Sequence, residues 1–132
     1  MAPQNSPPPG GFIWHDLAAA DTAAALDFYR AVFGWTAITE HANGGQFIRL
    51  QSDGHDVGSM YALSHTERMH GVPSHWTSYV RVESIDAATR RVEEAGGVAL
   101  VRPFEVNGVA RIALVADTLG SIMGLWESLP DE

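Results

Sequence analysis

Two side chains in this sequence have the chemistry for proton transfer. Asp16 lies in the stretch Phe12–Leu17, which alternates as a strand with Trp14 and Asp16 on one face. A carboxyl on a core-facing strand is costly unless it is paired or hydrated, and burial raises its pKa toward the range of a general acid or base. His75 begins a second predicted strand, and its imidazole could pair with Asp16 or take a proton itself. Asp16 and His75 are therefore the candidate catalytic residues.

Simpler interpretations of these residues stay open. Asp16 could be a surface carboxylate that accepts from a loop amide, and His75 could be a histidine bonded to backbone at the start of a strand. The five-residue spacing of His65, His70 and His75 matches neither a helical i, i+4 pair nor a familiar zinc motif, so His65 and His70 are interpreted as solvated loop residues. The sequence has no cysteine, which excludes disulfides, thiolate metal sites and cysteine nucleophiles.

Composition indicates one globular domain that does not bind nucleic acid. The chain has 132 residues, a formal net charge of −8 and no lysine, whereas nucleic acids and anionic membranes attract clustered basic residues. No apolar run reaches the ~18 residues of a membrane-spanning helix. Residues 1–10, MAPQNSPPPG, lack the pattern of a signal peptide and are expected to form a disordered Pro-rich tail. A cytoplasmic location is the default expectation.

Strand, helix and turn signals then follow one another in a repeated order. The strand at Gly11–Leu17 precedes a helix over 23–33, capped by Asp21 or Thr22 and ended by Gly34. Its predicted apolar stripe comprises Leu26, Tyr29, Val32 and Phe33. Three strands are predicted at 35–40, 46–51 and 57–63, with turns at 43–45 and 52–54. Residues 64–74 show no clear period and are predicted to be a surface loop.

The second half repeats this order. A strand at 75–82 precedes a helix over 85–95, which Ser84 caps and Gly96-Gly97 ends. Three strands are predicted at 98–102, 109–116 and 122–127, with turns at Asn107-Gly108 and Leu119-Gly120. The chain therefore reads βαβββ–βαβββ, an α+β pattern with an internal duplication.

Short motifs in both halves extend this similarity to a known family. The first half contains Asp21, Phe28-Tyr29-Arg30 and Phe33-Gly34-Trp35. The second contains Pro73-Ser74-His75-Trp76, Tyr79-Val80-Arg81-Val82, Ala95-Gly96-Gly97, Pro103 and Asp117…Gly120. In this order and spacing the sequence resembles the vicinal oxygen chelate superfamily, which includes glyoxalases, extradiol dioxygenases and fosfomycin- and bleomycin-resistance proteins.

The resemblance implies a specific architecture. It predicts a single domain over 11–128, made of two βαβββ modules at about 11–63 and 75–128 that form a partly open, barrel-like cup. It also implies that a small organic molecule binds in the cup and that the chain pairs as a homodimer.

The resemblance further implies where a metal would be held, and this sequence departs from the pattern. Counted from the motifs, the four ligand positions fall at Trp14, at Ser59 or Met60, at Thr77 and at Gly124. None of these residues is a competent metal ligand. We therefore predict no metal and no cofactor. A shifted strand register that uses His15, His75 and Glu127 stays open, although the strand phase of His15 and Glu127 is wrong in this alignment.

Without a metal, the residues expected to face the cup describe an aromatic pocket with one carboxylate. The predicted ligand-binding residues are Trp14, Asp16, Met60, Thr77, Tyr79, Gly124 and Trp126, with His75 beside them. Such a lining favours flat, apolar or cationic organic molecules. Gly124 is expected to leave room for a ligand, while Trp14 and Trp126 could instead simply fill the core.

Four functions fit these residues. The leading hypothesis is a drug-binding protein of the bleomycin-resistance type that sequesters its ligand without chemistry. The alternatives are a metal-independent isomerase, cyclase or lyase using Asp16 with His75, a metal-dependent lyase or dioxygenase, and an interaction subunit whose cup is filled by its own side chains. The sequence does not decide whether the protein is an enzyme.

Overall fold

The computed structural model describes residues 6–42, 45–106 and 108–130, and it divides into two compact units. The first unit spans His15–Thr77. The second runs from Ser78 onward and includes the N-terminal segment up to Trp14. The turns predicted at Asn43-Gly44 and at Asn107 fall on positions outside the described residues.

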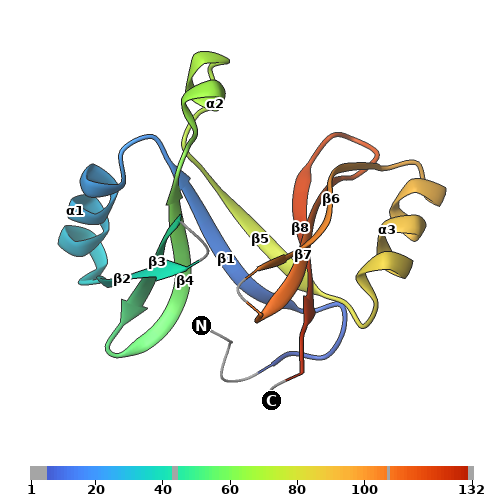
Figure 1. The fold of residues 1–132 in the computed structure, drawn as a ribbon, viewed down its shortest axis with the longest axis horizontal. Helices are drawn as coiled ribbons and strands as arrows, with labels where there is room; N and C mark the ends of the chain where they lie inside the picture. Colours follow the sequence, from blue (N-terminus) through green and yellow to red (C-terminus); the bar gives the residue numbers. More distant parts are fainter. Residues whose placement is uncertain (1–5, 43–44, 107, 131–132) are drawn as a thin grey trace. The chain divides into compact units, whose positions relative to one another are not determined.

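The first unit is a sheet with one helix against it (Figure 1). Its strands are the part of β1 (Phe12–Ala19) from His15 onward, β2 (Thr36–Ala42), β3 (Gly45–Ser52) and β4 (His55–Ala62), hydrogen-bonded in the order β2-β3-β4-β1. Helix α1 (Thr22–Phe33) begins at Asp21, whose carboxylate accepts from the Ala24 amide at 3.0 Å. It ends at Gly34, which adopts the left-handed conformation that glycine permits, with φ 73°.

The register between β1 and β4 decides which side chains lie under the helix. The two strands are parallel, and Asp16 pairs with Ser59 while Leu17 pairs with Met60. Leu17 and Met60 join Leu50 in the buried cluster against which α1 packs. Because side chains alternate along a strand, Asp16 and Ser59 occupy the opposite face of these strands.

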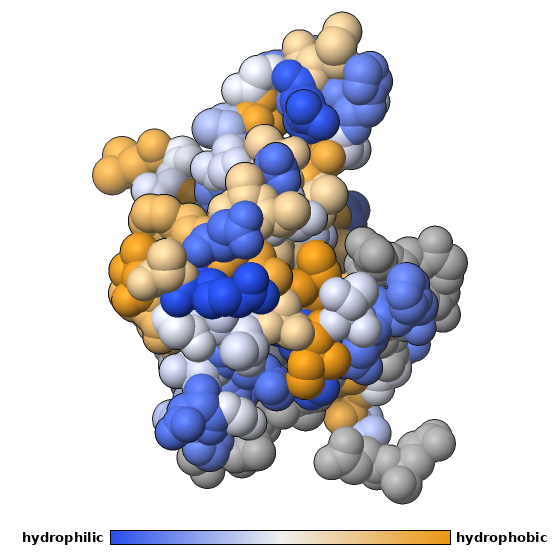
Figure 2. Space-filling view, turned by 90° about the vertical axis from the view of Figure 1, so that its left-hand side faces the viewer, coloured by the Kyte–Doolittle hydropathy of each residue, from blue (hydrophilic) through white to orange (hydrophobic). Residues whose placement is uncertain are grey.

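Helix α1 buries only part of its apolar surface. Leu26 and Tyr29 pack on the core cluster, as the predicted stripe requires. Val32 and Phe33 remain 53% and 58% exposed, and Phe28 is 59% exposed, so the predicted stripe was too wide. Figure 2 looks onto this side of the molecule and shows hydrophobic surface interspersed with strongly polar groups.

The segment predicted to be a loop contains a short helix, so that prediction was wrong for its first half. Helix α2 (His65–Met69) follows β4 and stands away from the sheet (Figure 1). Ser64 and Glu67 form a capping box, in which the serine hydroxyl accepts from the Glu67 amide at 3.1 Å and Glu67 accepts from the Ser64 amide at 3.0 Å. The Ser-x-x-Glu pattern was the signal for this helix in the sequence.

The second unit repeats the arrangement of a sheet with one helix. Its strands are the part of β5 (His75–Arg81) from Ser78 onward, β6 (Val98–Val106), β7 (Ala110–Ala116) and β8 (Ile122–Ser128), in the order β5-β8-β7-β6. Helix α3 (Ile85–Glu94) begins at Ser84 and packs on β6, β7 and β8. Ile85 and Leu125 are members of the buried cluster beneath it.

The N-terminal segment is hydrogen-bonded to β5 over its described residues. The amide of Gly10 donates to the Arg81 carbonyl at 2.8 Å, and the Arg81 amide donates to the Gly11 carbonyl at 2.9 Å. The Arg81 guanidinium also donates to the Pro7 carbonyl at 2.7 Å. Residues 6–10 of the predicted tail are therefore attached to the second unit, and residues 1–5 lie outside the described part of the chain.

The predicted element order is confirmed apart from α2. Both βαβββ modules are present, with boundaries that differ by a few residues from those expected, so the α+β class is confirmed. The largest difference is β6, which continues past Pro103 to Val106. In the described residues no helix is both long enough and apolar enough to cross a membrane.

Candidate functional site

Asp16 is a partly buried carboxyl held by a hydroxyl on the neighbouring strand. The Ser59 hydroxyl donates to Asp16 Oδ1 at 2.9 Å, and this contact follows directly from their pairing in the β1–β4 register. Burial raises the pKa of Asp16 to about 6, and the Ser59 hydrogen bond and the charge of His75 oppose that rise. Asp16 therefore changes its charge close to neutral pH, which an exposed aspartate does not do.

His75 acts on Asp16 through its charge, and its ring is oriented by the backbone. The Nδ1 atom of His75 lies 2.8 Å from the Pro73 carbonyl oxygen, which can only accept, so Nδ1 carries a proton. In the neutral ring Nε2 is then the acceptor, and it is the atom able to take up a proton. The segment before His75 is held by Ser74, whose hydroxyl accepts from the Ala20 amide at 2.9 Å.

Tyr61 is a site residue that the sequence reasoning missed. It pairs with Ala18, two residues along β1 from Asp16, so it lies on the same face as Asp16 and Ser59. Burial and the charges of Asp16 and Glu67 raise the pKa of Tyr61, so its hydroxyl stays protonated and can donate to a ligand. Ser59 and Tyr61 alternate with Met60 along β4, which indicates that they share a face. Only the register with β1 shows that this is the face of Asp16.

The other predicted residues of the first unit have different surroundings. Met60 was expected to face a ligand, but it is 1% exposed and packs in the cluster under α1. The prediction was wrong because adjacent residues of a strand point to opposite faces, and the residue on the Asp16 face is the one before Met60. Ser59, its neighbour, takes the place on the Asp16 face. Thr77 is buried at 7% exposure.

In the second unit the predicted aromatic residues pack against one another. The rings of Trp14 and Trp126 lie 6.0 Å apart, and Tyr79 meets Trp126 edge-on at 6.2 Å. All three are 5% exposed or less. The Trp126 indole donates to the Ser128 hydroxyl at 3.0 Å, which satisfies its polar atom within the protein. These contacts are those of core side chains.

The space above Gly124 is occupied by Tyr79. The two residues are paired in the β5–β8 register, and a Cβ placed on Gly124 would collide with the Tyr79 ring. The expectation that Gly124 leaves room for a ligand is therefore corrected, because the glycine accommodates a ring of the same chain.

The residues at the four positions implied for a metal do not fit one. Trp14 and Gly124 lie in the aromatic packing just described, Met60 lies under α1, and Thr77 offers only a hydroxyl. Ser59, the other candidate for the second position, uses its hydroxyl to bind Asp16. These positions supply no set of donors that a divalent ion requires.

The shifted register considered for a metal finds no support in the structure either. Glu127 accepts from the Ile85 amide at 2.8 Å and so stabilises the start of α3, while His75 bonds to the Pro73 carbonyl. His15 precedes Asp16 on β1 and therefore lies in the opposite strand phase. Within the described ranges no three His, Asp or Glu side chains are placed to hold one ion.

The first prediction concerns the cost of ionising Asp16. The folded-state pKa of about 6 exceeds the ordinary value of 3.8, so stability is greatest below the unfolded-state pKa and falls as the pH rises through the folded-state value. Asp16→Asn should therefore stabilise the protein by about 3 kcal/mol near a pH of about 8 and by almost nothing near a pH of about 4. Urea denaturation at both pH values measures this, with Asp53→Asn at an exposed turn as control. Equal stability of Asp16→Asn and the native chain at the higher pH would contradict it.

The second prediction concerns the packing of Gly124. Gly124→Ala should destabilise the protein by about 1–3 kcal/mol, because the added methyl group forces the Tyr79 ring out of its position. In a Tyr79→Ala background the same substitution should cost clearly less. A double-mutant cycle by chemical denaturation measures this coupling, and additive effects of the two substitutions would count against the contact.

Comparison with known proteins agrees with the architecture described above. Residues 11–121 match the model of the Glyoxalase/Bleomycin resistance protein/Dioxygenase superfamily. The chain is 36% identical over 129 residues to the anthracycline biosynthesis protein DnrV of Streptomyces peucetius, covering 89% of this chain and 47% of that protein. The anthracycline biosynthesis protein DauV of Streptomyces sp. strain C5 shows the same identity and coverage. The chain thus spans about half the length of these curated relatives.

Solved structures show the same fold at low sequence identity. Methylmalonyl-CoA epimerase from Mycobacterium tuberculosis superimposes with a TM-score of 0.65 at 19% identity, covering 96% of this chain and 95% of that one. A superfamily member from Vibrio splendidus 12B01 superimposes with a TM-score of 0.58 at 16% identity, covering 89% of this chain and 100% of that one. With two βαβββ modules and a family match over most of its length, the chain belongs to the Glyoxalase/Bleomycin resistance protein/Dioxygenase superfamily.

Proposed function

We propose that the protein binds a small organic molecule that carries a basic amine on an apolar or aromatic framework, and that it does so without a metal. Asp16 is the anchoring residue. The observation that carries this proposal is the partly buried Asp16 carboxyl, which accepts from the Ser59 hydroxyl at 2.9 Å and whose pKa is raised by burial to about 6. A buried carboxylate gains most from a cationic partner, and a ligand amine would supply one.

The surroundings of Asp16 support a cationic ligand over an anionic one. Glu67 supplies a second negative charge close to this site, since its carboxylate helps to raise the pKa of Tyr61. Tyr61 adds a hydroxyl that can donate to an oxygen of the ligand. The net charge of −8 attracts cations at longer range. Two relatives are named for anthracycline biosynthesis, so anthracyclines are the first compounds to test.

The third prediction is that an anthracycline with its amino sugar binds more tightly than the corresponding neutral aglycone. Binding of the amine should strengthen as the pH rises through the Asp16 pKa of about 6, because only the ionised carboxyl attracts it. Asp16→Asn should weaken amine binding about ten- to a hundredfold and remove this pH dependence. Calorimetry at several pH values measures both effects.

The matched control is Asp53→Asn, which removes a carboxylate at an exposed turn and should leave the affinity unchanged. Equal affinity for amine and aglycone, or a pH profile that survives in Asp16→Asn, would refute the anchoring role. If neither compound binds, a wider panel of aromatic amines is tested, and the proposal is refuted if none of them binds.

A second candidate function is proton transfer between Asp16, His75 and a carbon acid. It is favoured by one observation, the bond between His75 Nδ1 and the Pro73 carbonyl, which leaves Nε2 of the neutral ring as the acceptor. The raised pKa of Asp16, about 6, makes its carboxyl a candidate to exchange a proton with a substrate near neutral pH.

The fourth prediction tests this candidate by incorporation of deuterium from heavy water. A neutral β-diketone and methylmalonyl-CoA serve as carbon acids, and the acidic face favours the neutral compound. Asp16→Asn and His75→Gln should each slow incorporation at least about a hundredfold if the two side chains move the proton, whereas His70→Gln should not. Mass spectrometry follows the label. Failure of the native protein to accelerate exchange of any compound would leave binding as its function.

A further inference from the structure

A cavity of about 340 Å³ lies in the second unit, and its lining includes none of the residues predicted above to bind a ligand. It is bounded by the last turn of α3 and by the adjoining ends of β7 and β8. The apolar side chains that form its wall include Val92 from the helix, Val115 from β7, and Ile122, Met123 and Leu125 from β8. Its volume lies within the range of small-molecule sites, which are typically concave and apolar.

Small residues leave this cavity unfilled, and apolar side chains at its edge are exposed to water. Ala95, Gly97 and Ala116 line it and carry too little side chain to fill it. At its edge Ile122 is 59% exposed and Met123 is 37% exposed, so part of the apolar wall faces water. Covering such side chains with an apolar ligand removes them from water, which is favourable in proportion to the area covered.

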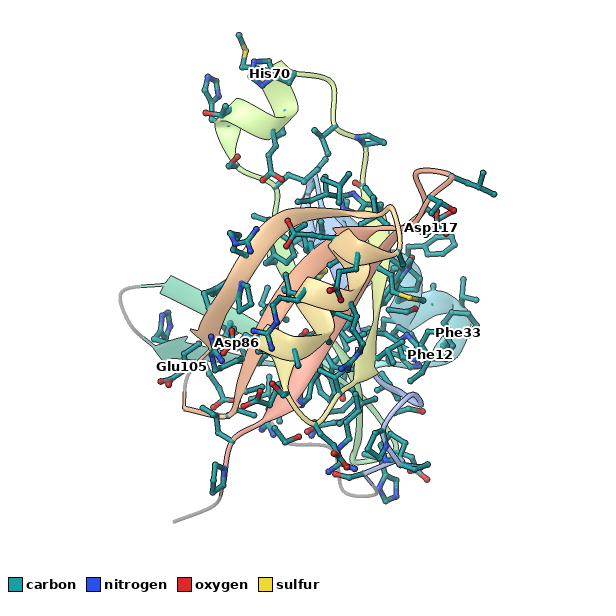
Figure 3. The ribbon with its side chains drawn as sticks, turned by 90° about the vertical axis from the view of Figure 1, so that its right-hand side faces the viewer. Phe12, Phe33, His70, Asp86, Glu105 and Asp117 are labelled. Carbon is teal, nitrogen blue, oxygen red and sulfur yellow. The ribbon has the colours of Figure 1, made fainter. Side chains whose placement is uncertain are left out.

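The polar groups at the cavity are concentrated in the turn between β7 and β8. Asp117 Oδ1 accepts from the Leu119 amide at 2.8 Å and from the Ser121 amide at 3.0 Å. These hydrogen bonds lower the pKa of Asp117, so the carboxylate stays ionised. Figure 3 shows Asp117 at the end of α3 opposite to Asp86, which lies near the start of the helix. A fixed negative charge at this edge disfavours anionic ligands.

We propose that this cavity is a second binding site, for an uncharged and predominantly apolar small molecule that inserts between α3 and the sheet. Its apolar part contacts the wall formed by Val92, Val115 and Leu125. A polar end, such as a hydroxyl, lies toward the turn at Asp117. This site is independent of the proposed amine site, because its residues all belong to the second unit.

The fifth prediction tests the site with primary alcohols from butanol to octanol. Methyl NMR spectra of the full chain should show shifts at Ile122 and Met123, while Met60 in the first unit stays unaffected. Each added methylene should tighten binding about three- to fourfold until the cavity is full. Heptanoate should bind more weakly than heptanol because of the Asp117 carboxylate.

Filling the cavity should weaken this binding. Ala116→Leu places a larger side chain in the wall, and Ala95→Leu does the same from the exposed end of α3, where it does not disturb the fold. Each should weaken heptanol binding at least about tenfold, whereas Ala23→Leu on the exposed surface of α1 should not change it. Shifts spread evenly over both units, affinity that is independent of chain length, or undiminished binding in Ala95→Leu would overturn the proposal.

Discussion

The pairing of β1 with β4 is the constraint on which the rest of the candidate site depends. In this register Leu17 lies beside Met60 and Asp16 beside Ser59. If β1 slipped by one residue, its side chains would change faces, so that the Asp16 carboxyl would lie under α1 and Leu17 would take the opposite face. The hydrophobic cluster resists such a slip because Leu17 would lose its burial beside Leu50 and Met60. The position of the reactive carboxyl is therefore fixed by apolar packing on the opposite side of the same strands.

This arrangement makes Asp16 a source of both instability and reactivity. The folded chain tolerates a carboxyl whose ionisation is made costly by burial, and one hydroxyl and the charge of His75 offset part of that cost. A carboxyl in these conditions responds strongly to whatever approaches it, since a cation relieves the cost of its ionisation and a proton acceptor competes for its proton. The aromatic packing of Trp14, Tyr79 and Trp126 has the opposite character, because its contacts are already satisfied within the chain.

Local signals in the sequence were sufficient for most of the fold. Asp21, Gly34 and Ser84 mark helix ends through chemistry that acts within a few residues, and each occupies the predicted place. The sequence left Ser59 and Met60 as alternatives at one position of β4, and the pairing of Asp16 with Ser59 across β1 and β4 decides between them. Asp16 was identifiable as an acidic residue on a core strand, whereas Ser59 and Tyr61 become site residues only through a long-range parallel pairing. The homodimer and the cytoplasmic location stay predictions.

The attachment of the N-terminal segment to β5 also bears on the order in which the chain can fold. Gly10 and Gly11 pair with Arg81, and Trp14 packs on Trp126, so the earliest residues need partners some seventy to more than one hundred positions later. Contacts so distant in sequence close slowly, because the loop between them must lose its freedom first. During synthesis His15–Thr77 can complete its own contacts while the preceding segment still lacks its partners. The second unit is consequently completed only after Trp126 has left the ribosome.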